Sequence, residues 1–325
     1  MKRRARWPAT SPVLFWAPIF RPKVTGRAEL GYINPPAPSP TPVRPAAPEN
    51  RKDPMPDSAK HILEERSEDV VTLRFHDPER RNAMTAAMGE AFASHIARLA
   101  GDSSLRAVVL TGSGRAFSAG GDLEMLDERA RQGRSGPGVA RYPIRDAMRA
   151  FYKLFLSVRD LPCPTIAAIN GHAIGAGLCV ALGCDIRIVA QEAKLGLNFT
   201  RLGLHPGMAA TWNLPRLVGP GMAAELLYSS RLFSGDEAAR IGLANRALPA
   251  EEVLESGLSL AREIAGCAPL AVRGVKRALA QSEVSGIEDQ LSFEAAEQAI
   301  CFESEDVQEG IAAAKERREP VFSGR

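Results

Sequence analysis

The chain lacks long hydrophobic runs and has little net charge. None of its 325 residues belongs to an unbroken apolar stretch of about 18, which argues against a membrane-spanning helix. The 41 Lys and Arg residues nearly balance the 38 Asp and Glu residues, so the formal net charge is only +3. A charge this small does not indicate a nucleic-acid binder.

Cysteine is scarce and scattered. The five cysteines are Cys163, Cys179, Cys184, Cys267 and Cys301, and no two of them form a C-x-x-C pair. An odd number at these spacings predicts neither a disulfide framework nor a zinc site, and we expect neither a metal nor a separate cofactor. Free thiols that pack as small hydrophobic side chains fit a reducing cytoplasm, which is the compartment that we expect.

Charge and proline are unevenly distributed along the chain. Residues 1–56 contain 13 of the 24 prolines, and their 10 Lys and Arg against 3 Asp and Glu give a charge of +7, which leaves −4 on the other 269 residues. Proline fixes φ and lacks a backbone donor, so we expect a basic, extended and disordered leader. A start codon assigned too far upstream is the alternative, with Met55 as the native start; N-terminal sequencing distinguishes the two. Prolines interrupting the first apolar stretch disfavour a signal peptide.

The body of the chain alternates strands and helices. Short apolar runs predict buried strands at 70–75, 107–111, 165–169 and 186–189, with a further strand at 62–63. Helical periodicity predicts helices at 84–99, at 144–156 and in a segment ending at Leu182. Glycines and arginines predict a flexible surface loop at 128–141, and mostly helical segments follow Gly219. Repetition of strand, helix and strand predicts an α/β fold with parallel pairing.

Two glycine-rich junctions follow two of these strands. One spans 116–123 and the other 170–177, and their small residues let the backbone approach a ligand closely. The second junction opens a helix, whose first amides lack partners within the helix and attract negative charge. Two amides converging there would form an oxyanion hole for a carbonyl that becomes an enolate. Two tight turns without a ligand are the alternative, and neither segment matches the dinucleotide pattern G-x-G-x-x-G.

These segments resemble the signatures of the enoyl-CoA hydratase/isomerase (crotonase) family. The similar segments are 108–112 with 117–123, 169–177 with 184–186, Asp77-Pro78 with 81–84, 202–207, 214–219 and the C-terminal 309–322. They cover about residues 60–325 in order, and the leader lies outside them.

The resemblance implies a fold, a ligand and an assembly. The fold is a crotonase-like ββα-superhelix spiral at 57–255, followed by a C-terminal helical trimerisation region at 256–325, and the assembly is a homotrimer or hexamer. The ligand is an acyl-CoA thioester, whose oxygen would lie between the amides of Gly121 and Ala176. The implied substrate contacts are Arg81, Ala83, Ala119, Gly120, Asp122, Leu123, Gly175 and Gly207.

The chain departs from the family at the two acid–base positions. Hydration needs a base for water and an acid for the α-carbon, and two glutamates supply them in family hydratases. Here these positions hold Cys179 and Phe199. Phenylalanine transfers no proton, and a buried thiol stays mostly protonated. An ordinary two-glutamate mechanism is therefore not expected.

Other side chains are candidates to replace the glutamates. His205, near the Pro206-Gly207 turn, is one candidate, with capping or packing at that turn as the alternative. Asp122 is another, although it more readily holds its loop by hydrogen bonds. Phe199, Met208 and Trp212 are expected to shape an apolar acyl site. The function expected is that of an enolate-stabilising acyl-CoA enzyme, by hydration, isomerisation, decarboxylation or thioester hydrolysis. The alternatives are an acyl-CoA-binding protein without catalysis and an interaction protein that works through its leader.

Overall fold

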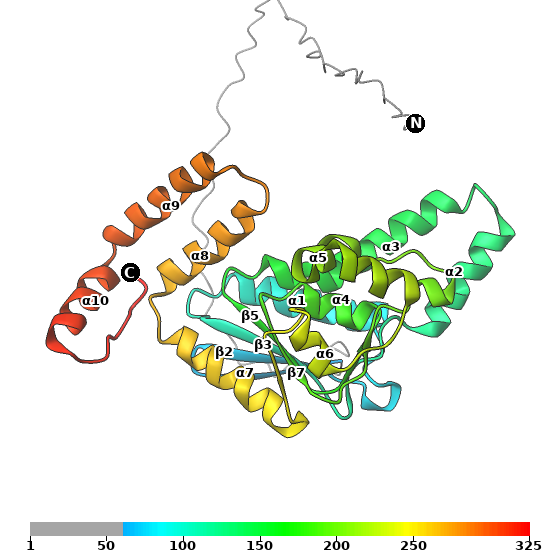
Figure 1. Cartoon of the computed structure of the whole chain (residues 1–325), viewed down its shortest axis with the longest axis horizontal. Helices are drawn as coiled ribbons and strands as arrows, with labels where there is room; N and C mark the ends of the chain where they lie inside the picture. The colour runs from blue at the N-terminus through cyan, green and yellow to red at the C-terminus, as the bar shows by residue number, and fades with distance from the viewer. Residues whose placement is uncertain (1–60) are drawn as a thin grey trace, which may run out of the picture. The chain divides into compact units, whose positions relative to one another are not determined.

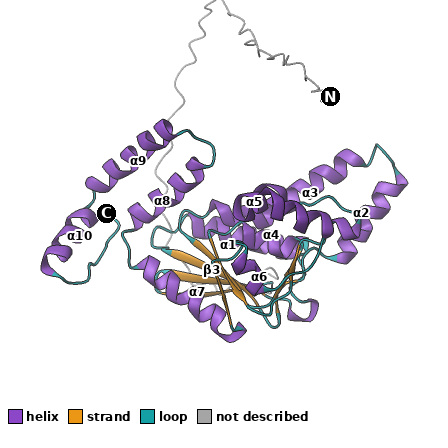
Figure 2. Ribbon diagram, in the orientation of Figure 1, coloured by secondary structure: helices purple, strands orange, loops and turns teal. Residues whose placement is uncertain are grey.

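Two β-sheets with helices packed around them organise the chain (Figures 1 and 2). The structure, a computed structural model, describes residues 61–325. The expected leader and the alternative start at Met55 lie outside the described residues. Within 61–325, no helix is both long and apolar enough to cross a membrane.

The larger sheet has six strands in the order β1-β2-β3-β5-β7-β9. They are β1 (Ile62–Ser67), β2 (Val70–Phe75), β3 (Ala107–Gly112), β5 (Thr165–Ile169), β7 (Ile186–Ala190) and β9 (Arg246–Leu248). The first two strands form an antiparallel hairpin, and every other neighbouring pair is parallel. The expected parallel α/β core is therefore confirmed.

The chain also forms a smaller sheet, to which it adds strands between successive strands of the larger one. Its strands are β4 (Ala116–Ser118), β6 (His172–Ile174) and β8 (Leu195–Gly196), paired in that order. The chain enters the larger sheet with β3, β5 and β7, and after each of these it enters the smaller sheet. Each turn of this spiral therefore adds one strand to both sheets. The spiral was expected, but strands this short show no periodicity and were not predicted.

A helix covers each face of the larger sheet. On one face, the ring of Phe75 in β2 lies 5.4 Å, centroid to centroid, from that of Phe92 in α1 (Ala86–Ala100). On the other, Gly257 of α7 (Ala250–Ala265) is so close that a Cβ there would lie 3.5 Å from Val109 of β3. The boundary expected between the spiral core and the C-terminal helical region, at residues 255 and 256, falls inside α7. This helix packs on the sheet, so the helical region beyond the sheet begins with α8.

Residues 128–141 are not a flexible loop, contrary to expectation. Helices α2 (Leu123–Ser135) and α3 (Arg141–Leu156) occupy most of the segment. Asp122 caps α2 by accepting a hydrogen bond from the Met125 amide (2.9 Å). Asp127 pairs with Arg131 one turn along the helix (2.6 Å). The arginines that suggested a loop are good helix formers, and an (i, i+4) ion pair adds to that preference.

The remaining helices follow the sheets in chain order. They are α4 (Ala176–Leu182), α5 (Ala210–Ser229), α6 (Gly235–Arg240), α8 (Pro269–Ser282), α9 (Ile287–Phe302) and α10 (Glu305–Glu316). Helix α5 begins before Gly219, where it kinks at a φ of 76°. Lys276 fastens α8 to the sheet, since its ammonium donates to the Cys163 carbonyl (2.8 Å) and pairs with Asp185 (2.9 Å).

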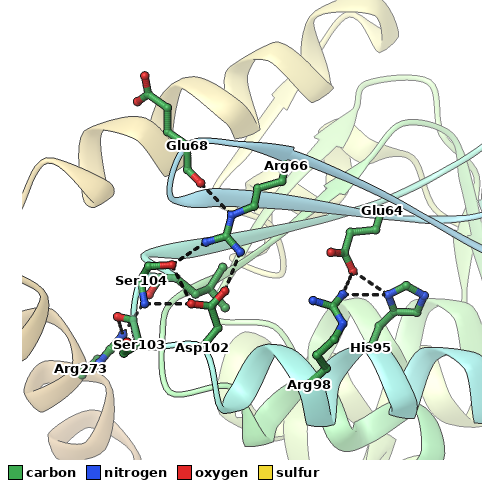
Figure 3. A network of polar contacts seen from close by, with 10 residues as sticks. Glu64, Arg66, Glu68, His95, Arg98, Asp102, Ser103, Ser104 and Arg273 are labelled. Carbon is green, nitrogen blue, oxygen red and sulfur yellow. Dashed lines mark hydrogen bonds and ion pairs between the residues drawn. The ribbon is translucent and has the colours of Figure 1, made fainter. Parts of the chain in front are cut away.

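Ion pairs fasten the edge strand β1 to its neighbours (Figure 3). Arg66 pairs with Asp102 (2.6 Å) and donates to the Ser104 hydroxyl (2.8 Å) in the loop after α1. Glu64 accepts from Arg98 of α1. Hydrogen bonds from Ser104 and then Arg66 hold the pKa of the Asp102 carboxyl well below its usual range. The hairpin is thus joined to α1 and to its loop by side chains as well as by packing.

Candidate active site

A cavity of about 710 Å³ opens where the two glycine-rich junctions meet α2 and α3. The expected site residues that line it are Ala83, Ala119, Gly120, Gly121, Asp122, Leu123, Gly175, Ala176, Phe199 and His205. Three expected residues, Arg81, Cys179 and Gly207, do not line it. Arg81 borders a separate cavity of about 550 Å³. The structure therefore brings most of the expected residues together around one space.

The first junction is held by backbone hydrogen bonds to the segment before α1. The Met84 amide donates to the Gly120 carbonyl (2.8 Å), and the Ala119 amide donates to the Arg81 carbonyl (2.8 Å). Gly120 has a φ of 91°, a conformation that side chains rarely tolerate. Asp122 ends the junction as the cap of α2 and pairs with Arg80. Asp122 therefore holds the loop, and a proton-transfer role is not needed to explain it.

The second junction connects β6 to α4. The Gly175 amide donates to the Gly196 carbonyl of β8 (2.8 Å), and Gly175 has a φ of 52°. A Cβ on Gly177 would lie only 2.7 Å from the Cβ of Ser118 in β4. Glycine at 177 thus lets the first turn of α4 pack against the strand that leads into the first junction.

The two junctions converge on the cavity. A Cβ on Gly120 would lie 2.4 Å from the Ile174 carbonyl oxygen and 3.4 Å from the Ala176 amide nitrogen. Both the Gly121 and the Ala176 residues line the cavity, and within 61–325 neither amide has a hydrogen-bond partner. Buried or partly buried amides are nearly always paired. The amides of Gly121 and Ala176, unpaired among residues 61–325, are therefore two donors on one cavity that a ligand oxygen can use.

The two positions at which the resemblance places glutamates, 179 and 199, carry no acid. Cys179 is fully buried in α4, and its sulfur lies 3.8 Å from the Gly207 carbonyl oxygen. Burial raises the pKa of the Cys179 thiol far above its usual value, so the thiol is protonated at neutral pH. Phe199 lines the cavity with an apolar ring. Neither side chain transfers protons there.

His205 lies in the wall of the cavity. Its side chain is exposed, and its Nδ1 lies 2.8 Å from the Pro206 carbonyl oxygen. Because a carbonyl only accepts, Nδ1 carries the hydrogen in this contact, and Nε2 is the ring nitrogen that the contact leaves uncommitted.

Trp212 is not part of the acyl site, contrary to expectation. Its ring contacts the guanidinium groups of Arg216 (3.9 Å to the ring centroid) and Arg159 (4.9 Å). Trp212 borders a different cavity, whereas Phe199 and Met208 line the main one as expected. Met208 precedes α5, and no residue of α5 itself lines the main cavity.

Sequence reasoning missed Tyr152. This residue of α3 lines the cavity and is partly buried. A Cβ on Gly207 would lie 2.4 Å from the Tyr152 hydroxyl oxygen, so the phenol packs directly on the Gly207 backbone. Gly207 thus acts on the site by making room for this side chain. Tyr152 belongs to no sequence motif. A helix was expected at 144–156, but the sequence did not indicate which face of that helix meets the cavity.

Comparisons with known proteins identify the family and the fold. The family model of enoyl-CoA hydratase/isomerase matches residues 65–325. A crotonyl-CoA hydratase of Syntrophomonas wolfei is 33% identical over 264 residues, which are 81% of this chain and 98% of that protein. A putative enoyl-CoA hydratase of Thermus thermophilus is 36% identical over 78% of this chain and 97% of its own length. The crystal structure of an enoyl-CoA hydratase from Bacillus anthracis superposes with a TM-score of 0.75 at 34% identity, covering 82% of this chain and all of that one.

Proposed function

Because the chain belongs to the enoyl-CoA hydratase/isomerase family, we propose that its cavity catalyses the addition of water to an enoyl-CoA thioester. This chain aligns with nearly the full length of relatives that are named as enoyl-CoA hydratases, and acyl-CoA chemistry is the function of the family. Coenzyme A enters as part of the substrate, so the proposal requires no separate cofactor.

The observation that carries the proposal concerns the backbone amides of Gly121 and Ala176, which have no hydrogen-bond partner among residues 61–325. The thioester oxygen accepts from both amides and becomes more negative as water adds and an enolate forms. Donors that are fixed before the reaction stabilise this charge without reorganising, which lowers the barrier selectively for the enolate. The same pair would serve isomerisation, decarboxylation or thioester hydrolysis, so product analysis decides among these reactions.

Ala176→Pro tests this use of the amide. Position 176 is the first residue of α4, where proline is tolerated, and the substitution removes the N–H. Loss of one such donor lowers kcat by about 10²–10³-fold. Ala176→Gly keeps the N–H and is expected to lose far less. Equal kcat values for Ala176→Pro and the parent, at equal protein stability, would exclude the oxyanion hole.

We also propose that the protein is a homotrimer or a pair of trimers. The C-terminal helices expose large apolar side chains, among them Val275, Leu279, Ile287, Leu291, Ile300 and Phe302. Exposed apolar patches of this kind mark association surfaces. Light scattering is expected to give three or six times the 34.9 kDa chain mass, and a monomer would contradict this.

The five free thiols support placing this enzyme in the cytoplasm, where thiols stay reduced. Fractionation of the native cells tests this placement, and recovery outside the cytoplasmic fraction would contradict it.

A further inference from the structure

Hydration needs two groups that transfer protons, and few side chains of the cavity qualify. The polar residues in its lining are Arg80, Asp122, Glu124, Arg129, Tyr152, Asn198 and His205. Arg80 and Asp122 are paired with each other, and Arg129 donates to Gln132. Glu124 lies in the first turn of α2, on a different segment from the positions of Cys179 and Phe199, and a side-chain amide such as that of Asn198 exchanges no proton readily. Tyr152 and His205 remain.

Tyr152 lies beside the position of the first absent glutamate. Its hydroxyl packs on the backbone of Gly207, and the Cys179 sulfur reaches the carbonyl of the same residue (3.8 Å). Cys179 follows Ala176 by three residues on α4, and residues at this spacing share a helix face. Gly207 therefore connects the Tyr152 hydroxyl with α4, the helix that begins at Ala176. Within 61–325, no hydrogen bond occupies this hydroxyl.

The surroundings of Tyr152 keep it protonated. Burial, and to a smaller extent the nearby Cys179, raise the pKa of the Tyr152 hydroxyl above its usual value. A group that holds its proton at neutral pH is suited to donate it only to a strongly basic centre, such as the α-carbon of an enolate.

His205 lies beside the position of the second absent glutamate. The Leu204 amide donates to the Phe199 carbonyl (2.9 Å), which closes a turn and brings His205 next to position 199. The Nδ1 hydrogen is directed at the Pro206 carbonyl (2.8 Å), so Nε2 is the ring nitrogen without this contact. An imidazole, a side chain that can act as a base, thus lies on a different segment from Tyr152.

We propose that Tyr152 is the proton donor and His205 the base of the hydration, in place of the two glutamates; this assignment rests on the proposed function. His205 Nε2 takes one proton of water while the water oxygen bonds to the β-carbon. The π electrons of the double bond pass to the enolate, whose oxygen the Gly121 and Ala176 amides hold. Tyr152 then gives its proton to the α-carbon, and the thioester carbonyl re-forms. A proton passing through cavity water from the imidazolium to the phenolate restores both residues, so that one water is added in total.

Tyr152→Phe tests the donor without disturbing the packing. The variant keeps the ring on Gly207 and removes only the oxygen, and kcat is expected to fall by about 10²–10⁴-fold with KM nearly unchanged. Tyr142→Phe is the matched control on the same helix: Tyr142 is exposed, stacks with Arg145 (5.2 Å) and does not line the cavity. The control is expected to keep the parent kcat.

His205→Gln tests the base, and the full-length parent separates this assignment from the proposed function. The variant is expected to lose about 10²–10⁴-fold in kcat while still binding enoyl-CoA. If the parent hydrates enoyl-CoA and either Tyr152→Phe or His205→Gln keeps the parent kcat, the assignment is overturned and the proposed function stands. If the parent converts no enoyl-CoA, the proposed function itself fails.

Discussion

At the scale of single residues, Cys179 and Phe199 decide what kind of chemistry the site can perform. The thiol is buried and protonated, and the phenyl ring is apolar, so both positions contribute packing rather than proton transfer. The two residues that we propose in their place, Tyr152 and His205, come from α3 and from the turn after Phe199. On this proposal, the proton transfers are supplied from neighbouring segments.

The buried thiols give a prediction about reactivity and pH. Burial raises the pKa of the Cys163 thiol to about 11 and that of Cys184 to about 12, and Cys179 lies higher still. The thiolate is the reactive form and appears only as the pH rises towards these values. At pH 8, a thiol reagent is expected to modify the exposed Cys267 rapidly and to spare the three buried residues until the protein unfolds.

Peptide mapping after timed labelling checks this expectation. Cys267→Ser is the control, since it should remove the fastest phase of labelling and leave the fold intact. Rapid modification of Cys179 in the folded protein would contradict the buried environment described above.

Sequence motifs located the residues whose backbone makes the site, but not all those whose side chains complete it. The two junctions were identified because their glycine patterns constrain the backbone, which is a local property, and the family resemblance pointed to Gly121 and Ala176 within them. Tyr152 was missed because its role depends on which face of α3 meets Gly207. That contact joins residues distant in sequence, and no local pattern records it.

At the scale of elements, the site depends on two strand-to-helix junctions held against each other. The junction after β4 and the junction before α4 touch through Gly120, whose absent side chain leaves room for the Ile174 carbonyl. Bonds to Met84 and Gly196 hold the two junctions from opposite sides. The close approach of the two junction backbones therefore sets the distance between the amides of Gly121 and Ala176.

Gly120→Ala tests this dependence. The new Cβ would lie 2.4 Å from the Ile174 oxygen at a φ of 91°, so the junctions must separate at a cost of about 1–3 kcal/mol in unfolding free energy. Acyl-CoA binding and kcat should fall together. Gly221→Ala is the control, because no atom lies within 4 Å of the added Cβ, and its unfolding free energy should change by under about 1 kcal/mol. A Gly120→Ala protein with parent stability and kcat would refute the close approach.

The elements were predictable in proportion to their length and periodicity. The buried strands β3, β5 and β7 and helices such as α1 show clear patterns and were expected. The segment at 128–141 was misread, because its glycines were weighted above the cap at Asp122 and the pair between Asp127 and Arg131. Strands of the smaller sheet exist through pairing with distant strands, which their own few residues do not encode.

At the scale of the whole molecule, the spiral explains why the site lies where it does. Each turn places one strand in each sheet, so the connections around β4 and β6 are adjacent although they are far apart in sequence. Resemblance to the family anticipated this arrangement, whereas the alternation of strand and helix patterns alone indicated only an α/β fold. The spiral thus brings two separate glycine patterns to one cavity.

The central claim is that this chain turns over an acyl-CoA in spite of its two absent glutamates. The direct measurement incubates the full-length protein with enoyl-, malonyl- and β-hydroxyacyl-CoA thioesters and identifies the products by mass spectrometry. The account predicts that enoyl-CoA gains the mass of one water and that the reaction saturates with substrate. Binding of these thioesters without conversion of any of them would contradict the account and identify an acyl-CoA-binding protein.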